Sequence, residues 1–114
     1  MLQFYGYKKC STCRQAEKHL IAKGTDYRFI DITQEAPSEA ILKKALQNNP
    51  LRALFNTSGV VYREQKIKDK LPTLSDSQAL KLLAQNGKLV KRPFVTDGKT
   101  VTVGFKEAFQ AAWG

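Results

Sequence analysis

Short apolar runs and amphipathic stretches alternate along the chain, and their order predicts the secondary structure. Leu2 to Tyr7 is an apolar, aromatic-rich run typical of a buried strand. From about Ser11 to Lys23 apolar residues recur at helical spacing, and Gly24 follows where a helix C-cap belongs. Tyr27 to Ile32 is rich in aromatic and branched residues, which favours a second strand. The first part of the chain therefore predicts a β-α-β unit.

The middle of the chain is predicted to be helical. One helix opens at Pro37-Ser38 and ends before Asn48-Asn49-Pro50. Another begins at Ser75, where Gln78 three residues later predicts a capping box, and we expect Gly87 to close it. Between these helices, residues 51–74 mix apolar and turn-forming residues, and their pattern predicts no single element.

The last part predicts a β-hairpin followed by a helix. Phe94–Thr96 and Thr100–Val103 flank Asp97-Gly98, a dipeptide that favours tight hairpin turns. The apolar residues of Phe105–Trp113 follow helical spacing. The whole chain thus predicts an α/β fold in which a β-α-β unit and a β-β-α unit form a mixed sheet. A helical insertion over about residues 34–90 separates the two units, and 114 residues are enough for one domain.

Composition and cysteine count favour a soluble intracellular protein. Hydrophobic residues make up 42% of the chain and charged residues 25%, as in globular domains. No run approaches the ~20 apolar residues of a membrane span, and the N-terminus lacks the apolar run of an export signal. Two cysteines are too few for a secreted disulfide scaffold. We therefore expect a cytoplasmic protein without a membrane partner.

The net charge of +9 favours anionic ligands without indicating DNA binding. The positive residues are scattered, and only Lys66, Lys68 and Lys70 form a local cluster. The chain has no helix-turn-helix pattern, zinc-finger spacing or interleaved aromatic motif, so we expect no sequence-specific DNA binding. A solvated basic surface is one explanation of the charge. Affinity for glutathione, oxyanions or an acidic partner surface is the other.

The C-x-x-C motif of Cys10 and Cys13 lies between the first predicted strand and the first predicted helix. Free N–H groups and the helix dipole stabilise a thiolate at a helix N-terminus, and Lys8, Lys9 and Arg14 add positive charge nearby. Cys13 follows one helical turn after Cys10, close enough to form a small disulfide with it. The pattern predicts an exposed attacking thiol at Cys10 and a resolving thiol at Cys13 that faces inward.

Two other interpretations of these cysteines remain. They could form half of a zinc site, but such a site normally needs four ligands and His19 is the only histidine, so we expect no metal. They could also be inert buried thiols, since free cysteine is among the most buried residue types. The position at a strand-to-helix junction disfavours that second interpretation.

Two arginines are candidate anion-binding residues. Arg92 stands before Pro93 at the start of a predicted strand, and from sequence alone this peptide bond is expected to be trans. Arg52 is a single charge in the apolar run Leu51–Asn56, so we expect it to face a cleft or to pair with a carboxylate. Either guanidinium could bind an oxyanion through two hydrogen bonds.

Three parts of the chain resemble the thioredoxin-fold family that contains glutaredoxin-coupled arsenate reductases and the Spx/MgsR regulators. They are Tyr5–Ala16, Leu51–Gly59, and Leu89–Phe94 together with Val103–Phe105, and they follow the family's order over nearly the whole chain. The resemblance implies a thioredoxin-like fold with a helical insertion. It also implies that Pro93 is cis and lies opposite the cysteine motif.

In the arsenate reductases of this family, one cysteine attacks arsenate, three arginines hold the oxyanion, and glutathione with glutaredoxin resolves the adduct. By position, the resemblance implies that Cys10 is the nucleophile and that Arg52 and Arg92 are the first two arginines. The third arginine has no match at Val103–Phe105, and the histidine that precedes the nucleophile falls on Gly6. The oxyanion site of those enzymes is therefore incomplete in this sequence.

Cys13 resembles the second cysteine of the Spx-type regulators, in which a C-x-x-C motif is a redox switch and the partner is the C-terminal domain of the RNA polymerase α subunit. The segment Leu51–Gly59 is more similar to the reductase-like members, and its turn resembles that of the YffB-type glutathione-dependent reductases. We predict a thiol-disulfide oxidoreductase with no bound cofactor and with glutathione, glutaredoxin or thioredoxin as reductant. An Spx-like regulator and a glutaredoxin-coupled arsenate reductase are the alternatives. The expected catalytic residues are Cys10, Cys13 and Arg92, and the expected anion-binding residues are Arg52, Arg14, Lys9 and Pro93.

Overall fold

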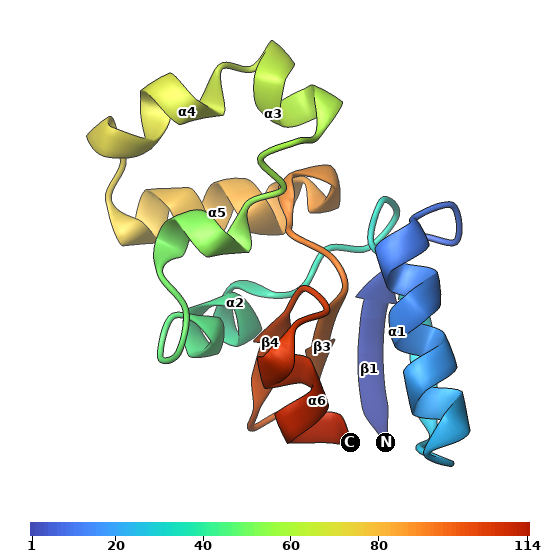
Figure 1. The fold of residues 1–114 in the computed structure, drawn as a ribbon. Coiled ribbons are helices and arrows are strands. Elements are labelled where there is room, and N and C mark those ends of the chain that lie inside the picture. Colours follow the sequence, from blue (N-terminus) through green and yellow to red (C-terminus); the bar gives the residue numbers. More distant parts are fainter.

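A four-stranded mixed sheet lies at the centre of the computed structural model, which describes residues 1–114 (Figure 1). The strand order is β2-β1-β3-β4. Strand β1 (Leu2–Gly6) runs parallel to β2 (Tyr27–Asp31) and antiparallel to β3 (Phe94–Thr96), which pairs antiparallel with β4 (Val101–Val103). The predicted α/β fold, a β-α-β unit and a β-β-α unit joined by a helical insertion, is confirmed.

Helices cover both faces of this sheet. The first helix, α1, connects β1 to β2, and the insertion between β2 and β3 carries four short helices and three 3₁₀ turns before the chain ends in α6 (Figure 1). No helix is both long and apolar enough to cross a membrane. The helices are α1 (Ser11–Ala22), α2 (Glu39–Ala45), α3 (Val60–Glu64), α4 (Ile67–Lys70), α5 (Asp76–Gln85) and α6 (Glu107–Trp113), and the 3₁₀ turns are η1 (Leu51–Leu54), η2 (Leu71–Thr73) and η3 (Gly87–Leu89).

Side-chain alternation along the strands divides the core into two clusters. Phe4 and Val95 are partners in the β1–β3 register and point into the cluster beneath α1 and α6. Tyr5 and Phe94 are the next pair and point into the larger cluster beneath α2 and α5. Successive residues of a strand face opposite sides of a sheet, so the same strands supply side chains to both clusters.

The helix α5 begins as its sequence predicts but ends differently. The Ser75 hydroxyl accepts a hydrogen bond from the Gln78 N–H at 3.1 Å, and the Gln78 side chain accepts one from the Ser75 N–H at 2.9 Å, so the capping box is confirmed. The expected closure by Gly87 is wrong, because Asn86 in extended conformation is the C-cap and Gly87 starts η3. Glycine is needed there for another reason: a Cβ at position 87 would collide with the carbonyl oxygen of Ile32.

The boundaries of the other elements agree with the sequence to within about two residues. Gly24, which follows α1, has a φ of +68°, in keeping with the expected C-cap. The C-terminal helix begins at Glu107 rather than Phe105, because Gly104 has a φ of +82° and Lys106 is extended. Residues 51–74, for which the sequence predicts no single element, contain four helical segments of three to five residues.

Candidate functional site

The two cysteines occupy the first turn of α1, and their exposure differs. Cys10 is the N-cap residue, with extended backbone (φ −83°, ψ 119°), and its Sγ accepts a hydrogen bond from the Cys13 N–H at 3.4 Å. Cys13 is completely buried, whereas Cys10 is half-buried, and both are free thiols. The prediction that Cys10 is the more accessible thiol and that Cys13 faces inward is confirmed.

The surroundings of the two thiols shift their pKa values in opposite directions. Burial by itself disfavours the Cys10 thiolate, but the N–H and thiol of Cys13, the Arg92 guanidinium and the N–H of Thr12 outweigh it. The pKa of Cys10 therefore lies below its usual value. For Cys13, burial is the largest effect and raises the pKa of its thiol to about 12. Near neutral pH, Cys10 carries the available thiolate and Cys13 keeps its proton.

Arg92 approaches this thiol pair from the segment that precedes β3. Its guanidinium carbon lies 5.2 Å from the centre of the Tyr7 ring, a cation–π contact that holds the charge near the nucleophile. The Arg92-Pro93 peptide is cis, as the family resemblance implies and as sequence statistics alone do not. Arg92 lines a hollow of about 200 Å³ next to the motif, whose other lining residues are Tyr7, Thr33, Asn56, Gly59, Val60, Val61 and Lys88.

The other basic residues near the motif have exposed side chains. Lys8 points toward Glu17, with 3.2 Å between Nζ and Oε1, and it lies 4.0 Å above the centre of the Phe29 ring. Lys9 and Arg14 are exposed. Among charged groups, Arg92 makes the largest contribution to the lowered pKa of Cys10. That Lys8, Lys9 and Arg14 add to this effect stays a prediction.

Glu17 is a buried polar residue that sequence reasoning missed. Its carboxylate accepts hydrogen bonds from Tyr27 Oη at 2.7 Å and from Lys8 Nζ, and so ties the turn before Cys10 to α1 and β2. Burial, together with this carboxylate, raises the pKa of Tyr27 to about 12, so the phenol remains a donor. The sequence spacing could have indicated this burial, because Glu17 follows Cys13 by four residues and therefore shares its buried helix face.

Arg52 lies in η1 and lines a hollow separate from the one beside Arg92. It faces a cleft, as its sequence context suggests, and pairs with no carboxylate. The structure thus brings Arg92 and the two cysteines together and places Arg52 in a neighbouring groove with Lys91 and Lys106. Neither lysine was singled out from the sequence.

The structure shows the surroundings of the two positions at which the family resemblance implies departures from the arsenate reductases. At Gly6, a Cβ would lie 2.6 Å from Cε1 of Phe4 and 3.2 Å from Sγ of Cys13, so the buried Phe4 ring fills the space that a side chain at position 6 needs. At Gly104 the chain turns with positive φ, and its N–H donates to the Pro93 carbonyl at 2.9 Å, with no arginine nearby in sequence. No group of three or more His, Cys, Asp or Glu side chains lies together as a metal site would require.

Comparisons with known proteins place these features in a family. Residues 5–112 match the family model described as the ArsC family. The protein YusI of Bacillus subtilis is 46% identical over 115 residues, covering 98% of this chain and 98% of YusI. The crystal structure of a possible arsenate reductase from Streptococcus mutans superimposes with a TM-score of 0.89 at 40% identity, covering 98% of this chain and 97% of that one. The global transcriptional regulator Spx of Streptococcus pyogenes is 28% identical over 109 residues, covering 94% of this chain and 80% of Spx.

Proposed function

The chain belongs to the ArsC family, and from that membership we propose that it is a thiol-disulfide oxidoreductase of the cytoplasm. Cys10 is the nucleophile and Cys13 the resolving thiol. The observation that carries the proposal is the contrast between them: a half-exposed Cys10 with a lowered pKa stands one turn before a buried Cys13 with a pKa of about 12. An attacking thiol must be ionised and accessible, whereas a resolving thiol needs only to reach its neighbour.

The reaction proceeds in two exchanges that balance. The Cys10 thiolate attacks one sulfur of a disulfide RSSR, forms a mixed disulfide and releases RS⁻. Cys13 then loses its proton and attacks the Cys10 sulfur, which closes the Cys10–Cys13 disulfide and expels the second RS⁻. The protein dithiol loses two electrons and two protons, and RSSR becomes two RSH. Glutathione, glutaredoxin or thioredoxin returns the protein to the dithiol by the reverse exchanges.

Arg92 serves this reaction by stabilising the Cys10 thiolate and by orienting an anionic group of the substrate. Arg52, Arg14, Lys9 and Pro93 contribute to the binding of an anionic substrate. These roles are supported by the placement of Arg92 next to Tyr7 and the thiols and by the exposure of Lys9 and Arg14.

A redox titration tests the proposal. The protein is equilibrated in a series of glutathione redox buffers, and its intact mass and free thiols are measured. We expect a loss of two hydrogens with a midpoint at roughly −270 to −180 mV, the range between thioredoxin and protein disulfide isomerase. Oxidation of the Cys13→Ser protein should stop at a glutathione adduct on Cys10.

Cys10→Ser is the matched variant, because it leaves only the buried thiol. It should form neither the disulfide nor an adduct, and it should lose disulfide reductase turnover. Full reductase activity in Cys10→Ser, or no oxidation of the unmodified protein at any potential, contradicts the proposal.

Similarity to Spx supports a second candidate, a redox-switched regulator that binds the C-terminal domain of the RNA polymerase α subunit. In this role the Cys10–Cys13 pair senses oxidants instead of turning over. A pull-down of that domain with the oxidised and the reduced protein tests it, and absence of binding in both forms excludes it.

Arsenate reduction ranks last, because the third arginine is missing and Phe4 fills the space beside Gly6. Arsenate-dependent thiol consumption with glutaredoxin would restore that activity as a candidate.

A further inference from the structure

Tyr7 contacts each of the three groups on which the proposed reaction depends. Its carbonyl oxygen accepts a hydrogen bond from the Cys10 N–H at 3.0 Å. Burial raises the pKa of Cys13, and a hydrogen bond from the Tyr7 backbone opposes that rise. The centre of the Tyr7 ring lies 5.2 Å from the guanidinium carbon of Arg92. The backbone of one residue therefore contacts both thiols, while its side chain contacts the cation beside them.

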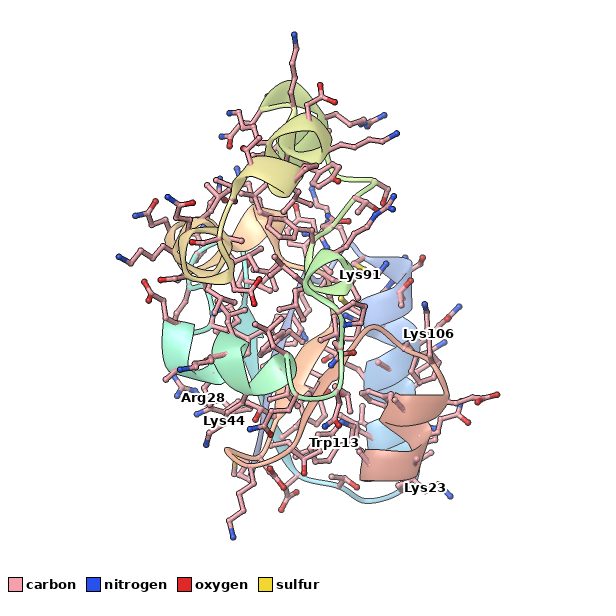
Figure 2. The ribbon with its side chains drawn as sticks, turned by 90° about the vertical axis from the view of Figure 1, so that its left-hand side faces the viewer. Lys23, Arg28, Lys44, Lys91, Lys106 and Trp113 are labelled. Atoms are coloured by element: carbon pink, nitrogen blue, oxygen red, sulfur yellow. The ribbon has the colours of Figure 1, made fainter.

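The ring of Tyr7 is the contact that directs the Arg92 guanidinium. Arg92 pairs with no carboxylate, since the one ion pair in the structure joins Lys8 and Glu17. The other charged residue that lines the same hollow is Lys88, which is also a cation and repels the guanidinium. Figure 2 shows Lys91, the residue before Arg92, at the level of the start of α1. An arginine side chain that reaches this helix end without an ionic partner needs the ring face to stay in place.

A fixed cation at this position acts on one redox state more than on the other. Burial disfavours the Cys10 thiolate, and the Arg92 guanidinium is among the groups that outweigh it. This thiolate exists in the dithiol form, whereas a Cys10–Cys13 disulfide carries no charge for the guanidinium to stabilise. Stabilising the reduced form of a C-x-x-C pair makes its disulfide more oxidising. The position of the guanidinium therefore affects the balance between dithiol and disulfide.

We propose that Tyr7 is a positioning residue whose ring holds the Arg92 guanidinium beside the Cys10 sulfur and so favours the dithiol form over the disulfide. This inference rests on the proposed oxidoreductase function and adds a residue that sets its redox equilibrium. The equilibrium is the exchange in which the protein dithiol and oxidised glutathione give the Cys10–Cys13 disulfide and two molecules of glutathione. The ring takes no part in the exchange of sulfurs and acts only through Arg92.

The test measures two linked quantities in side-chain variants of Tyr7, all of which keep its backbone contacts. One is the rate of Cys10 alkylation as a function of pH in Cys13→Ser protein. The other is the equilibrium constant for disulfide formation with oxidised glutathione at pH 8, in protein with both cysteines. We expect Tyr7→Leu to slow alkylation at pH 7 about two- to fivefold and to raise the equilibrium constant by up to about the same factor, the size of one exposed cation–π contact. Tyr7→Phe keeps the ring face and should match the unchanged protein in both measurements.

Arg92→Gln provides the control for the mechanism. Adding Tyr7→Leu to it should change neither quantity further, because the ring then has no guanidinium to hold. Tyr7→Gln is a second variant without a ring and replaces Tyr7→Leu if urea denaturation shows that the latter does not fold.

Three results overturn the inference and leave the proposed function standing. They are unchanged values in the variants without a ring, a shift of equal size in Tyr7→Phe, and a full additional shift when Tyr7→Leu is combined with Arg92→Gln. If the unchanged protein forms no Cys10–Cys13 disulfide at any glutathione potential, the proposed function itself fails, and the inference fails with it.

Discussion

At the scale of single residues, Arg92 is one of the groups that set how much of Cys10 is ionised at neutral pH. Its guanidinium is one of the groups that outweigh burial and lower the pKa of this thiol. We expect Arg92→Gln to raise the pKa of Cys10, so that the thiolate fraction at pH 7 falls several-fold and the reactive form is reached only at higher pH. The rate of Cys10 alkylation as a function of pH, measured in Cys13→Ser protein, gives that pKa.

Two controls accompany the Arg92 variant. Lys18→Gln removes a positive charge from the exposed face of α1 and should leave the pH profile in place. Arg92→Lys keeps the charge without the planar contact to Tyr7 and should give an intermediate pKa. Identical profiles for Arg92→Gln and the unchanged residue contradict the electrostatic role.

Gly87 is a second residue whose identity the structure explains. A Cβ there would collide with the Ile32 carbonyl oxygen, so Gly87→Ala must move backbone against backbone. We expect it to lower the free energy of unfolding by about 3 kcal/mol, at the upper end of overpacking effects. Gly24→Ala should lower the free energy of unfolding by only about 1 kcal/mol, because Gly24 has a φ of +68° but a Cβ there would meet no other atom within 4 Å. Urea denaturation measures both, and equal losses contradict this explanation.

Individual residues also show how much of the candidate site can be predicted from the sequence. The C-x-x-C motif predicts which thiol is accessible, because its position at a helix start follows from local pattern. The contributions of Arg92 and Glu17 depend on side-chain direction after distant segments have packed, and only the family resemblance led us to expect Arg92 at the nucleophile. Charge near the motif in sequence therefore suggested Lys8, whereas the structure directs Lys8 to Glu17 and brings Arg92 from the other end of the chain.

At the scale of elements, the best-predicted helix is α5, and its capping box should be measurable. Ser75→Ala removes the hydroxyl that accepts the Gln78 N–H, and we expect it to lower the free energy of unfolding by about 1 kcal/mol. Ser77→Ala changes an exposed serine inside the same helix and should have no cost, because alanine has the higher helix propensity. A Ser75→Ala protein as stable as Ser77→Ala contradicts a stabilising cap.

Elements with local signals were predictable, and those held by distant contacts were not. Strands β1 and β2, helices α1 and α5 and the hairpin at Asp97-Gly98 have periodicity, caps or turn residues of their own. The segments between residues 51 and 74 are three to five residues long, too short to be stable alone. Their helical turns depend on burial of Leu54, Tyr62 and Ile67 in the larger core cluster.

At the scale of the whole molecule, one sheet joins the two core clusters, so we expect them to unfold together. Leu20→Ala empties space in the cluster beneath α1, and Leu83→Ala does so beneath α5; each should lower the free energy of unfolding by about 2–5 kcal/mol. Trp113, whose Nε1 donates to the Thr102 hydroxyl at 2.8 Å, reports on α6 by fluorescence, and far-ultraviolet circular dichroism reports on all helices. Both probes should give one common midpoint in each variant. Separate midpoints for Leu83→Ala contradict a single cooperative unit.

The consecutive residues Lys91 and Arg92 line different hollows, and this has a consequence for protein engineering. A substitution at position 91 changes the charge of the groove while the guanidinium beside the nucleophile stays in place. A substitution at position 92 changes the nucleophile while the groove keeps its lysine. The charge of the groove and the charge beside the nucleophile can therefore be altered independently through two adjacent residues.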